Sequence, residues 1–342
     1  MKIATYLSSL WLLFMAGHAV ADNQNALLNN IKSTIQEYYV LSENIPAINT
    51  SLDNVTLQQT ISQAASKKQV AELLTQHLAQ FDKHFTVQYV PLSEQQNQSQ
   101  SEQVTQKEPW FQRLARNNAG FREVVVKKGN VGVLEFWGFA ELNTHTKKKI
   151  ASAMGMLSDV DALIIDLREN GGGSGETVSW LTSYFVEGKV HLNSFYTRYT
   201  DTLNPFYTEP TITNAQLASV PLYILIGPDT FSAAEEFAYN LKHLGRATIV
   251  GMPSKGGANP WRWFALEGDF RIGVPTTQAI NPITKSNWEG RGVQPDILIS
   301  EDNALEKAYI LALESLASSV TNRYQKDEIN TLLIDSNAIT GK

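Results

Sequence analysis

The spacing of hydrophobic positions along the chain changes near residue 85. Before that point the apolar residues recur at the interval of a helical face. The clearest run contains Val70, Leu73, Leu74, His77, Leu78 and Phe81. The segment FTVQYV (85–90) then alternates as a strand does. This pattern predicts a small helical region between residues 23 and 81, followed by one strand.

A polar segment separates this region from the rest of the chain. SEQQNQSQSEQVTQKE (93–108) is rich in Gln and Ser and has almost nothing to bury, so we expect an exposed, mobile loop. After it, FREVVVKK and NVGVLEFWGF read as two strands paired around Lys128, Gly129 and Asn130. Helical and buried-strand patterns then alternate: helix 143–157, strand 161–167, helix 174–186, strand 221–227, helix 232–243, strand 247–251 and helix 304–316. Such alternation predicts an α/β core, while the tail after Ser319 carries no clear pattern.

Composition narrows the classes of function. Hydrophobic residues make up 43% of the 342 and charged residues 18%, as in ordinary globular proteins. The net charge of −6 and the lack of basic runs argue against a nucleic-acid partner. There is no Cys, so a disulfide framework is excluded, and covalent catalysis would need Ser, Thr, Lys or a carboxylate.

The first 21 residues read as a signal peptide. They contain one Lys, an apolar stretch from Leu7 to Ala16 and the small-residue ending Ala19-Val20-Ala21. A membrane anchor would need about 20 apolar residues, and polar positions interrupt this stretch. We expect cleavage after Ala21, no membrane anchor afterwards, and a periplasmic or secreted protein.

Ser232 lies where a buried strand turns into a helix, in PLYILIG followed by PDTFSAAEEF. The first turn of a helix offers unpaired N–H groups and the positive end of the helix dipole, which stabilise an oxyanion. Ser is equally a preferred N-cap, and Glu235 would complete a capping box. Taken alone, this stretch therefore favours the structural interpretation.

A glycine-rich stretch changes that balance. In DLRENGGGSGE (166–176) a strand ends before three consecutive glycines, which can present bare N–H groups to a negative charge. The spacing matches neither a phosphate loop nor a dinucleotide fingerprint, so an oxyanion site fits better than an ordinary glycine turn. A serine nucleophile also needs a base, and His84 in FDKHF stands out because it lies at the junction of the helical region and the strand.

Together, DALIIDLRENGGG, PLYILIGPDTFSAAEEFAYNLKHLGRATIVG and NPITKSNWEGRGVQPDI resemble the carboxyl-terminal processing (tail-specific) protease family. The chain is most similar to the branch that contains tricorn core protease and interphotoreceptor retinoid-binding protein. The resemblance covers about residues 66–317. It implies an α/β fold with a crotonase-like (ClpP-like) ββα core, preceded here by an N-terminal helical subdomain.

The resemblance also implies the site residues. The nucleophile falls on Ser232, the base on His84, and the acid that orients the base on Glu289 in NWEGRG. The oxyanion donors would be the N–H groups of Ala233 and of the glycine run, Gly173 first and Gly172 beside it. No metal or cofactor is implied.

Two departures from the family pattern leave alternatives open. Other members place a Lys 25 residues after the nucleophile, where this chain has Gly257; Lys255 is two residues early, which disfavours a Ser–Lys dyad. Close relatives often have a His where this chain has Asn259. Asn259 and Trp288 are candidates for the substrate cleft, although core packing is the commoner role of a Trp.

The resulting prediction is an exported serine endopeptidase that acts on peptides or unfolded protein. Its expected divisions are a signal peptide (1–21), a helical subdomain (22–84), a strand and polar loop (85–118), a catalytic core (119–320) and a tail (321–342). About 45 residues separate His84 from NVGVLEF, too few for an inserted peptide-binding PDZ domain. A non-catalytic carrier of a hydrophobic small molecule and a scaffold that acts by binding partners remain as alternatives on the same fold.

Overall fold

The computed structural model describes residues 25–91, 108–212 and 215–340. The predicted signal peptide and all but Glu108 of the predicted polar loop lie outside these residues. The chain divides into two compact units. The first takes its described residues from 1–105, 196–202 and 259–278, and the second from 106–195, 203–258 and 279–342.

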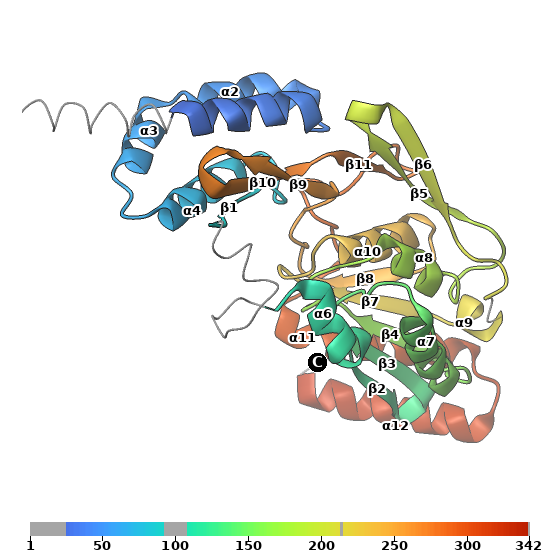
Figure 1. Ribbon diagram of the computed structural model, residues 1–342. Helices are drawn as coiled ribbons and strands as arrows, with labels where there is room; N and C mark the ends of the chain where they lie inside the picture. Colours follow the sequence, from blue (N-terminus) through green and yellow to red (C-terminus); the bar gives the residue numbers. More distant parts are fainter. Residues whose placement is uncertain (1–24, 92–107, 213–214, 341–342) are drawn as a thin grey trace, which may run out of the picture. The chain divides into compact units, whose positions relative to one another are not determined.

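The second unit is built on a six-stranded sheet with the order β12-β8-β7-β4-β3-β2 (Figure 1). Its strands are β2 (Phe121–Lys127), β3 (Val131–Phe136), β4 (Ala162–Asp166), β7 (Leu222–Ile226), β8 (Thr248–Gly251) and β12 (Ile297–Leu298). β2 and β3 are antiparallel neighbours, and the remaining pairs are parallel. The carboxyl ends of β4 and β7 therefore meet at one edge, and this edge carries the candidate site.

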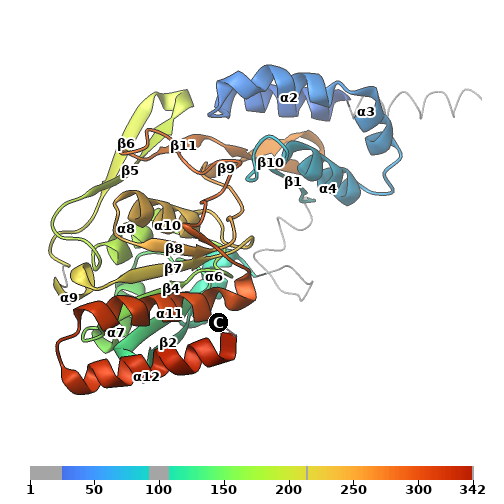
Figure 2. The ribbon, with the colours of Figure 1, turned by 180° about the vertical axis from the view of Figure 1, so that it is seen from behind.

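Helices cover both faces of this sheet. One face packs against α7 (Thr144–Met156), α8 (Gly175–Thr182) and α10 (Ala233–His243), through strand residues such as Ile224 and Ile226. The other face packs against α11 (Glu301–Ser319) and α12 (Arg323–Thr340), through Tyr223 and Leu225 (Figure 2). Because both of its faces are covered, the sheet has central strands β4 and β7 that are buried along their whole length, and their sequences are hydrophobic runs.

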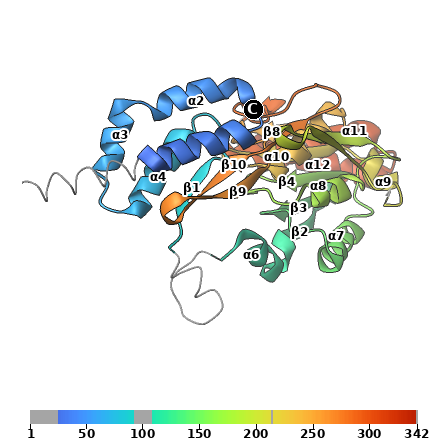
Figure 3. The ribbon, with the colours of Figure 1, turned by 45° about the horizontal axis from the view of Figure 1, so that its top comes forward.

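The first unit packs helices against a small antiparallel sheet (Figure 3). Its helical part comprises residues 25–38, a 3-10 turn (Ser42–Asn44), α2 (Ile45–Leu52), α3 (Val55–Ser62) and α4 (Lys67–Leu78). The sheet has the order β1-β10-β9, from β1 (Thr86–Tyr89), β9 (Trp261–Leu266) and β10 (Phe270–Pro275). This unit therefore combines the start of the chain with a hairpin from much later in the sequence.

A third sheet has the order β11-β5-β6, from β5 (His191–Thr197), β6 (Thr202–Tyr207) and β11 (Thr277–Ile280). The divisions between the two units fall within or beside these strands. Two short helices, α6 (Trp110–Arg116) and α9 (Ala215–Ser219), complete the second unit.

The mixed α/β class and the central alternation of helices and strands are confirmed. The paired strands around Lys128 and the helices and strands predicted between residues 143 and 316 are present within a few residues of their expected bounds. The sequence analysis did not predict the helices α6, α9 and α12 or the strands β5, β6, β9, β10, β11 and β12. Of these strands, β6 and β9 are largely exposed, and several of the strands contain polar or aromatic residues at irregular intervals, so no clear period marks them. No described helix combines the length and apolarity that crossing a membrane requires.

Candidate active site

The residues Gly227–Ser232, called the Ser232 turn here, connect β7 to α10 in a strained conformation. Ser232 has φ +55° and ψ −118°, which a non-glycine residue adopts rarely and only when its surroundings hold it. The Thr230 hydroxyl accepts from the N–H of Gly227 at 2.9 Å and donates to the carbonyl of Leu167 at 2.7 Å. The turn is thus tied to the end of β4. A Ser on a strained strand-to-helix turn is the arrangement that exposes a nucleophilic hydroxyl.

The glycine loop, residues Asn170–Ser174, packs directly on this turn. A Cβ atom on Gly172 would come within 2.8 Å of the Ser232 Cβ and 2.6 Å of the Phe231 carbonyl oxygen. A Cβ atom on Gly173 would collide with the carbonyl oxygen of Phe139. Both glycines also have positive φ angles, +86° and +146°. Only residues without a side chain fit this approach.

Buried Asn170 fixes the glycine loop. Its Oδ1 accepts from the N–H of Gly172 at 2.9 Å, and its Nδ2 donates to the carbonyl of Phe136 at 2.8 Å. The N–H of Phe231 in turn donates to the Asn170 carbonyl at 3.0 Å. The loop and the turn are therefore held together by Asn170, a residue to which the sequence analysis gave no role of its own.

The backbone amides around Ser232 differ in what they contact. The N–H of Gly172 is engaged by Asn170, and the N–H of Ser232 donates to Glu235 Oε2 at 2.8 Å. Among the described residues, no hydrogen bond uses the N–H of Gly173 or of Ala233. These are two of the amides that the sequence analysis selected as oxyanion donors. Gly172, also selected, contributes the close approach of the loop instead, because its amide is already used.

Glu235 is the organising residue behind the turn. Its buried carboxylate accepts from Ser232 N and from the loop after β8, with Ser254 Oγ at 2.6 Å, Gly256 N at 2.6 Å and Gly257 N at 2.9 Å. Burial raises the pKa of this carboxyl, and the four hydrogen bonds oppose that rise. The sequence showed Glu235 only as a capping residue, and nothing local indicated the loop that it holds.

Lys255 belongs to that same loop. Its N–H donates to the carbonyl of Thr230 at 3.1 Å, and its exposed ammonium lies 4.9 Å from the centroid of the Phe231 ring. Among the described residues no hydrogen bond joins this ammonium to Ser232. The contact is a cation–π contact with the neighbour of the nucleophile, which does not favour a Ser–Lys dyad.

Trp288 and Glu289 lie in the loop before β12. The Trp288 indole is buried, donates to the Gly257 carbonyl at 2.9 Å and packs on Tyr239, so its contacts are those of a core residue. Glu289 is half-buried, and its Oε2 accepts from the N–H of Ala258 at 2.6 Å. Glu289 thereby holds the loop after β8 at Ala258, and Glu235 holds the same loop between Ser254 and Gly257.

His84 lies in the first unit, between α4 and β1. We call His84 and its neighbours Asp82 and Asn259 the His84 corner. Asp82 Oδ1 accepts from the His84 backbone N–H at 2.9 Å and lies 3.4 Å from the imidazole Nδ1. Asp82 Oδ2 accepts from Asn259 Nδ2 at 2.8 Å. All three residues are buried. The sequence analysis missed Asp82, although its place two residues before His84 was a signal.

Comparison with known proteins identifies the family. A sequence model of peptidase family S41 matches residues 130–299, and a model described as the N-terminal domain of Peptidase_S41 in eukaryotic IRBP matches residues 18–135. The chain belongs to peptidase family S41. It is a serine-type peptidase.

Solved structures agree with this S41 assignment at the level of the fold. A candidate peptidase from Parabacteroides merdae ATCC 43184 is 16% identical with a TM-score of 0.62, and the match covers 87% of this chain and 99% of that protein. The photosystem II D1 C-terminal processing protease is 14% identical with a TM-score of 0.52, over 82% and 93%. A lipoprotein from Streptococcus agalactiae is 13% identical with a TM-score of 0.50, over 84% and 96%.

In this S41 peptidase the site residues predicted from sequence are divided between the units. Ser232, Ala233, both glycines, Lys255, Trp288 and Glu289 belong to the second unit, and His84 and Asn259 to the first. Within the second unit, the structure brings the glycine loop against the Ser232 turn. Within the first, it brings Asn259 to Asp82.

A second carboxyl on α10, Glu236, is buried behind the turn. Burial raises its pKa to about 8, while the amide of Asn193 acts in the opposite direction. A Cβ atom on Gly175 would lie 3.5 Å from Glu236 Oε2, so the group faces the start of α8. At neutral pH this carboxyl is protonated, in contrast to an ordinary Glu.

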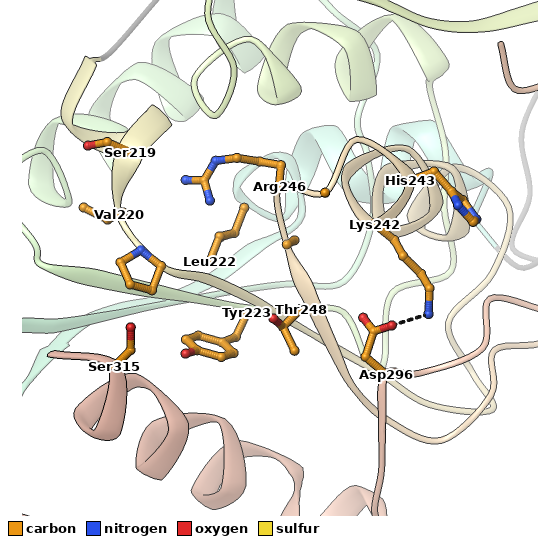
Figure 4. A pocket seen from close by; sticks show the side chains of 13 residues that line it. Ser219, Val220, Leu222, Tyr223, Lys242, His243, Arg246, Thr248, Asp296 and Ser315 are labelled. Atoms are coloured by element: carbon orange, nitrogen blue, oxygen red, sulfur yellow. Dashed lines mark ion pairs between the residues drawn. The ribbon is translucent and has the colours of Figure 1, made fainter. Parts of the chain in front are cut away.

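A pocket of about 650 Å³ lies elsewhere in the second unit (Figure 4). Its lining includes Pro221–Tyr223 and Ala247–Thr248, at the amino ends of β7 and β8, and the ion pair of Lys242 with Asp296. Ser232 follows the carboxyl end of β7, where sites of parallel sheets form. The pocket is thus at the wrong end of these strands to hold the substrate of Ser232.

Proposed function

We propose that this S41 peptidase hydrolyses peptide bonds with Ser232 as nucleophile, His84 as general base and acid, and Glu289 as the acid that orients His84. The proposal includes a crotonase-like core for the second unit. It also includes export by the signal peptide predicted in residues 1–21 to the periplasm or the outside of the cell. Peptides and unfolded protein are the proposed substrates.

The reaction proceeds in two stages. Ser232 Oγ attacks the carbonyl carbon of the substrate while His84 takes the hydroxyl proton, and His84 then returns the proton to the leaving amine as the C–N bond breaks. A water then attacks the acyl-enzyme, gives its proton to His84, and releases the carboxyl product with regeneration of the Ser232 hydroxyl. Both tetrahedral intermediates carry an oxyanion, which the N–H groups of Ala233 and Gly173 stabilise.

The observation that carries the proposal is the pairing of a strained Ser232 with two amides that no described residue engages. Strain of this kind costs roughly 1–3 kcal/mol, and it persists only where the surroundings enforce it. An ordinary N-cap Ser adopts relaxed extended angles and has no need of a glycine loop in contact with its Cβ. The geometry of the turn therefore supports a chemical role for Ser232 beyond capping.

Labelling with a fluorophosphonate probe tests this function. We expect the wild type to be labelled at Ser232 and to degrade dye-labelled unfolded casein, and we expect Ser232→Ala and His84→Ala to lose both activities by at least about 10³-fold. Lys255→Ala keeps most of the rate if the triad is right, and a collapse in that variant would support the dyad instead.

The same experiment separates the enzyme from its alternatives. A folded wild type that is neither labelled nor active would contradict the proposal and favour a carrier or a scaffold. Folding of every variant is checked by its thermal unfolding curve, because His84 and its partners are buried. Cell fractionation with an antibody would show whether the processed protein leaves the cytoplasm.

A further inference from the structure

The His84 corner contains a charged group that the proposed triad does not use. Asp82 is 2% exposed, and two hydrogen bonds fix its carboxylate, one from the His84 backbone N–H to Oδ1 and one from the Asn259 amide to Oδ2. The His84 Nδ1 atom lies 3.4 Å from Oδ1. Burying a carboxylate is unfavourable unless polar partners compensate it. An acid at this position therefore needs an explanation beyond the shape of the turn.

A turn alone would not require an acid. The bond from the His84 N–H to Asp82 Oδ1 links residues two apart, which Asn forms as well as Asp. What only Asp supplies is negative charge, 3.4 Å from the Nδ1 atom of a buried imidazole. A carboxylate at that nitrogen favours the tautomer with the proton on Nδ1, and it stabilises the imidazolium that forms during proton transfer.

We propose that Asp82 is a positioning residue for His84, with Asn259 holding the Asp82 carboxylate in place. Asp82 keeps Nδ1 protonated, so that Nε2 is the nitrogen that accepts the proton of Ser232. This inference rests on the proposed function, since it assigns a partner to the proposed base. Since an imidazole has only two ring nitrogens, Asp82 then shares the Nδ1 proton with Glu289, and Asn259 has a role that is separate from substrate contact.

The decisive variant is Asp82→Asn, which removes the charge and preserves the shape. Asn259 can adapt to the new amide by rotating its own, because among the described residues its Oδ1 has no hydrogen-bond partner. With dye-labelled unfolded casein as substrate, we expect kcat to fall about 10²-fold while KM stays within about twofold. A group that acts on the base affects the chemical step and leaves substrate binding unchanged.

Asn259→Ala tests the support of the carboxylate. We expect kcat to fall about 10-fold with KM unchanged, and the double variant with Asp82→Asn to lose little more than Asp82→Asn alone. Lys83→Gln is the matched control, because Lys83 lies between Asp82 and His84 and is exposed. Its kcat should equal that of the wild type.

The outcomes separate this inference from the function on which it rests. If Ser232→Ala retains the wild-type rate, the proposed function fails. If Ser232→Ala is inactive but Asp82→Asn keeps kcat within about threefold of the wild type and loses only thermal stability, Asp82 is structural and the inference is wrong. A fall in kcat at a temperature well below the melting point of the variant supports it.

Discussion

In the Ser232 turn, backbone groups make most of the contacts, whereas side chains make the contacts of the His84 corner. The turn depends on glycines at 172 and 173 and on backbone hydrogen bonds, such as that from Phe231 N–H to the Asn170 carbonyl. The corner depends on a carboxylate, an imidazole and a carboxamide. A site of the first kind should tolerate no added atom, and a site of the second kind should tolerate changes that preserve shape but not changes of charge.

The sharpest test of this contrast is Gly172→Ala. The new methyl group would meet Ser232 Cβ and the Phe231 carbonyl, at a residue with φ +86°. We expect peptidase activity to fall by at least about 10³-fold, and the free energy of unfolding to fall by about 2–4 kcal/mol, because both overlap and strain oppose the substitution. Casein turnover and urea unfolding measure the two effects.

Gly188→Ala is the control for that variant. Gly188 also has a positive φ, +72°, but no atom lies within 4 Å of the added methyl group. It should lose only about 1 kcal/mol of stability and keep its activity. Equal losses of activity in the two variants would mean that overlap with the Ser232 turn is not the cause.

Glu235→Gln should have the next largest effect. One of the four donors around the carboxylate would then face the amide NH₂ group of Gln. We expect a loss of about 2 kcal/mol in stability and at least a 10-fold fall in kcat, because the loop from Ser254 to Gly257 is released from the turn. Thermal unfolding and fluorophosphonate labelling rates would show both. Full activity in a measurably destabilised variant would restrict Glu235 to a structural role.

Glu236→Gln should have the smallest effect on activity and a distinctive effect on stability. The pKa of Glu236 is raised from 4.5 to about 8 in the folded protein, so the native state binds the proton that the unfolded state loses. The stability that this group contributes is therefore fully present below about pH 4.5, and it is lost progressively as the pH rises to about 8. At pH 7 the raised pKa of Glu236 lowers the free energy of unfolding by about 3 kcal/mol relative to its value at low pH.

Replacing Glu236 by the neutral Gln removes that dependence. We expect the variant to match the wild type near pH 4.5 and to exceed its stability by about 3–4 kcal/mol at pH 8, as measured by urea unfolding at both values. Equal pH profiles for the two proteins would show that Glu236 is ionised in the native state.

The sequence predicted the parts of this site whose geometry is local. Ser232 and the glycine loop each follow a buried strand, and the strand-to-helix pattern with consecutive glycines indicates the backbone geometry directly. The mixed α/β fold followed from the same alternation. The crowding that excludes a side chain at Gly172 is also local, since two neighbouring loops produce it.

Side-chain partners distant in sequence could not be predicted in this way. Asp82 and Asn259 are separated by 177 positions, and no period in the sequence links them. The strand β1 likewise pairs with β10, which lies far away in the sequence. The sequence of the helical region therefore does not indicate that a later hairpin completes its sheet. The sequence indicated only a capping role for Glu235. Its contacts with Ser254, Gly256 and Gly257 form only in the folded chain, so they could not be predicted.

The pairing of β1 with β10 also sets an order of events during protein synthesis. The amino-terminal helices leave the ribosome early, but the sheet that buries Val87 against Ile272 and Val274 cannot close until the chain has been translated past Pro275. Until then the nascent helices expose apolar surface. We therefore expect that ribosome-bound chains stalled before β10 bind chaperones, and that release occurs once this hairpin emerges.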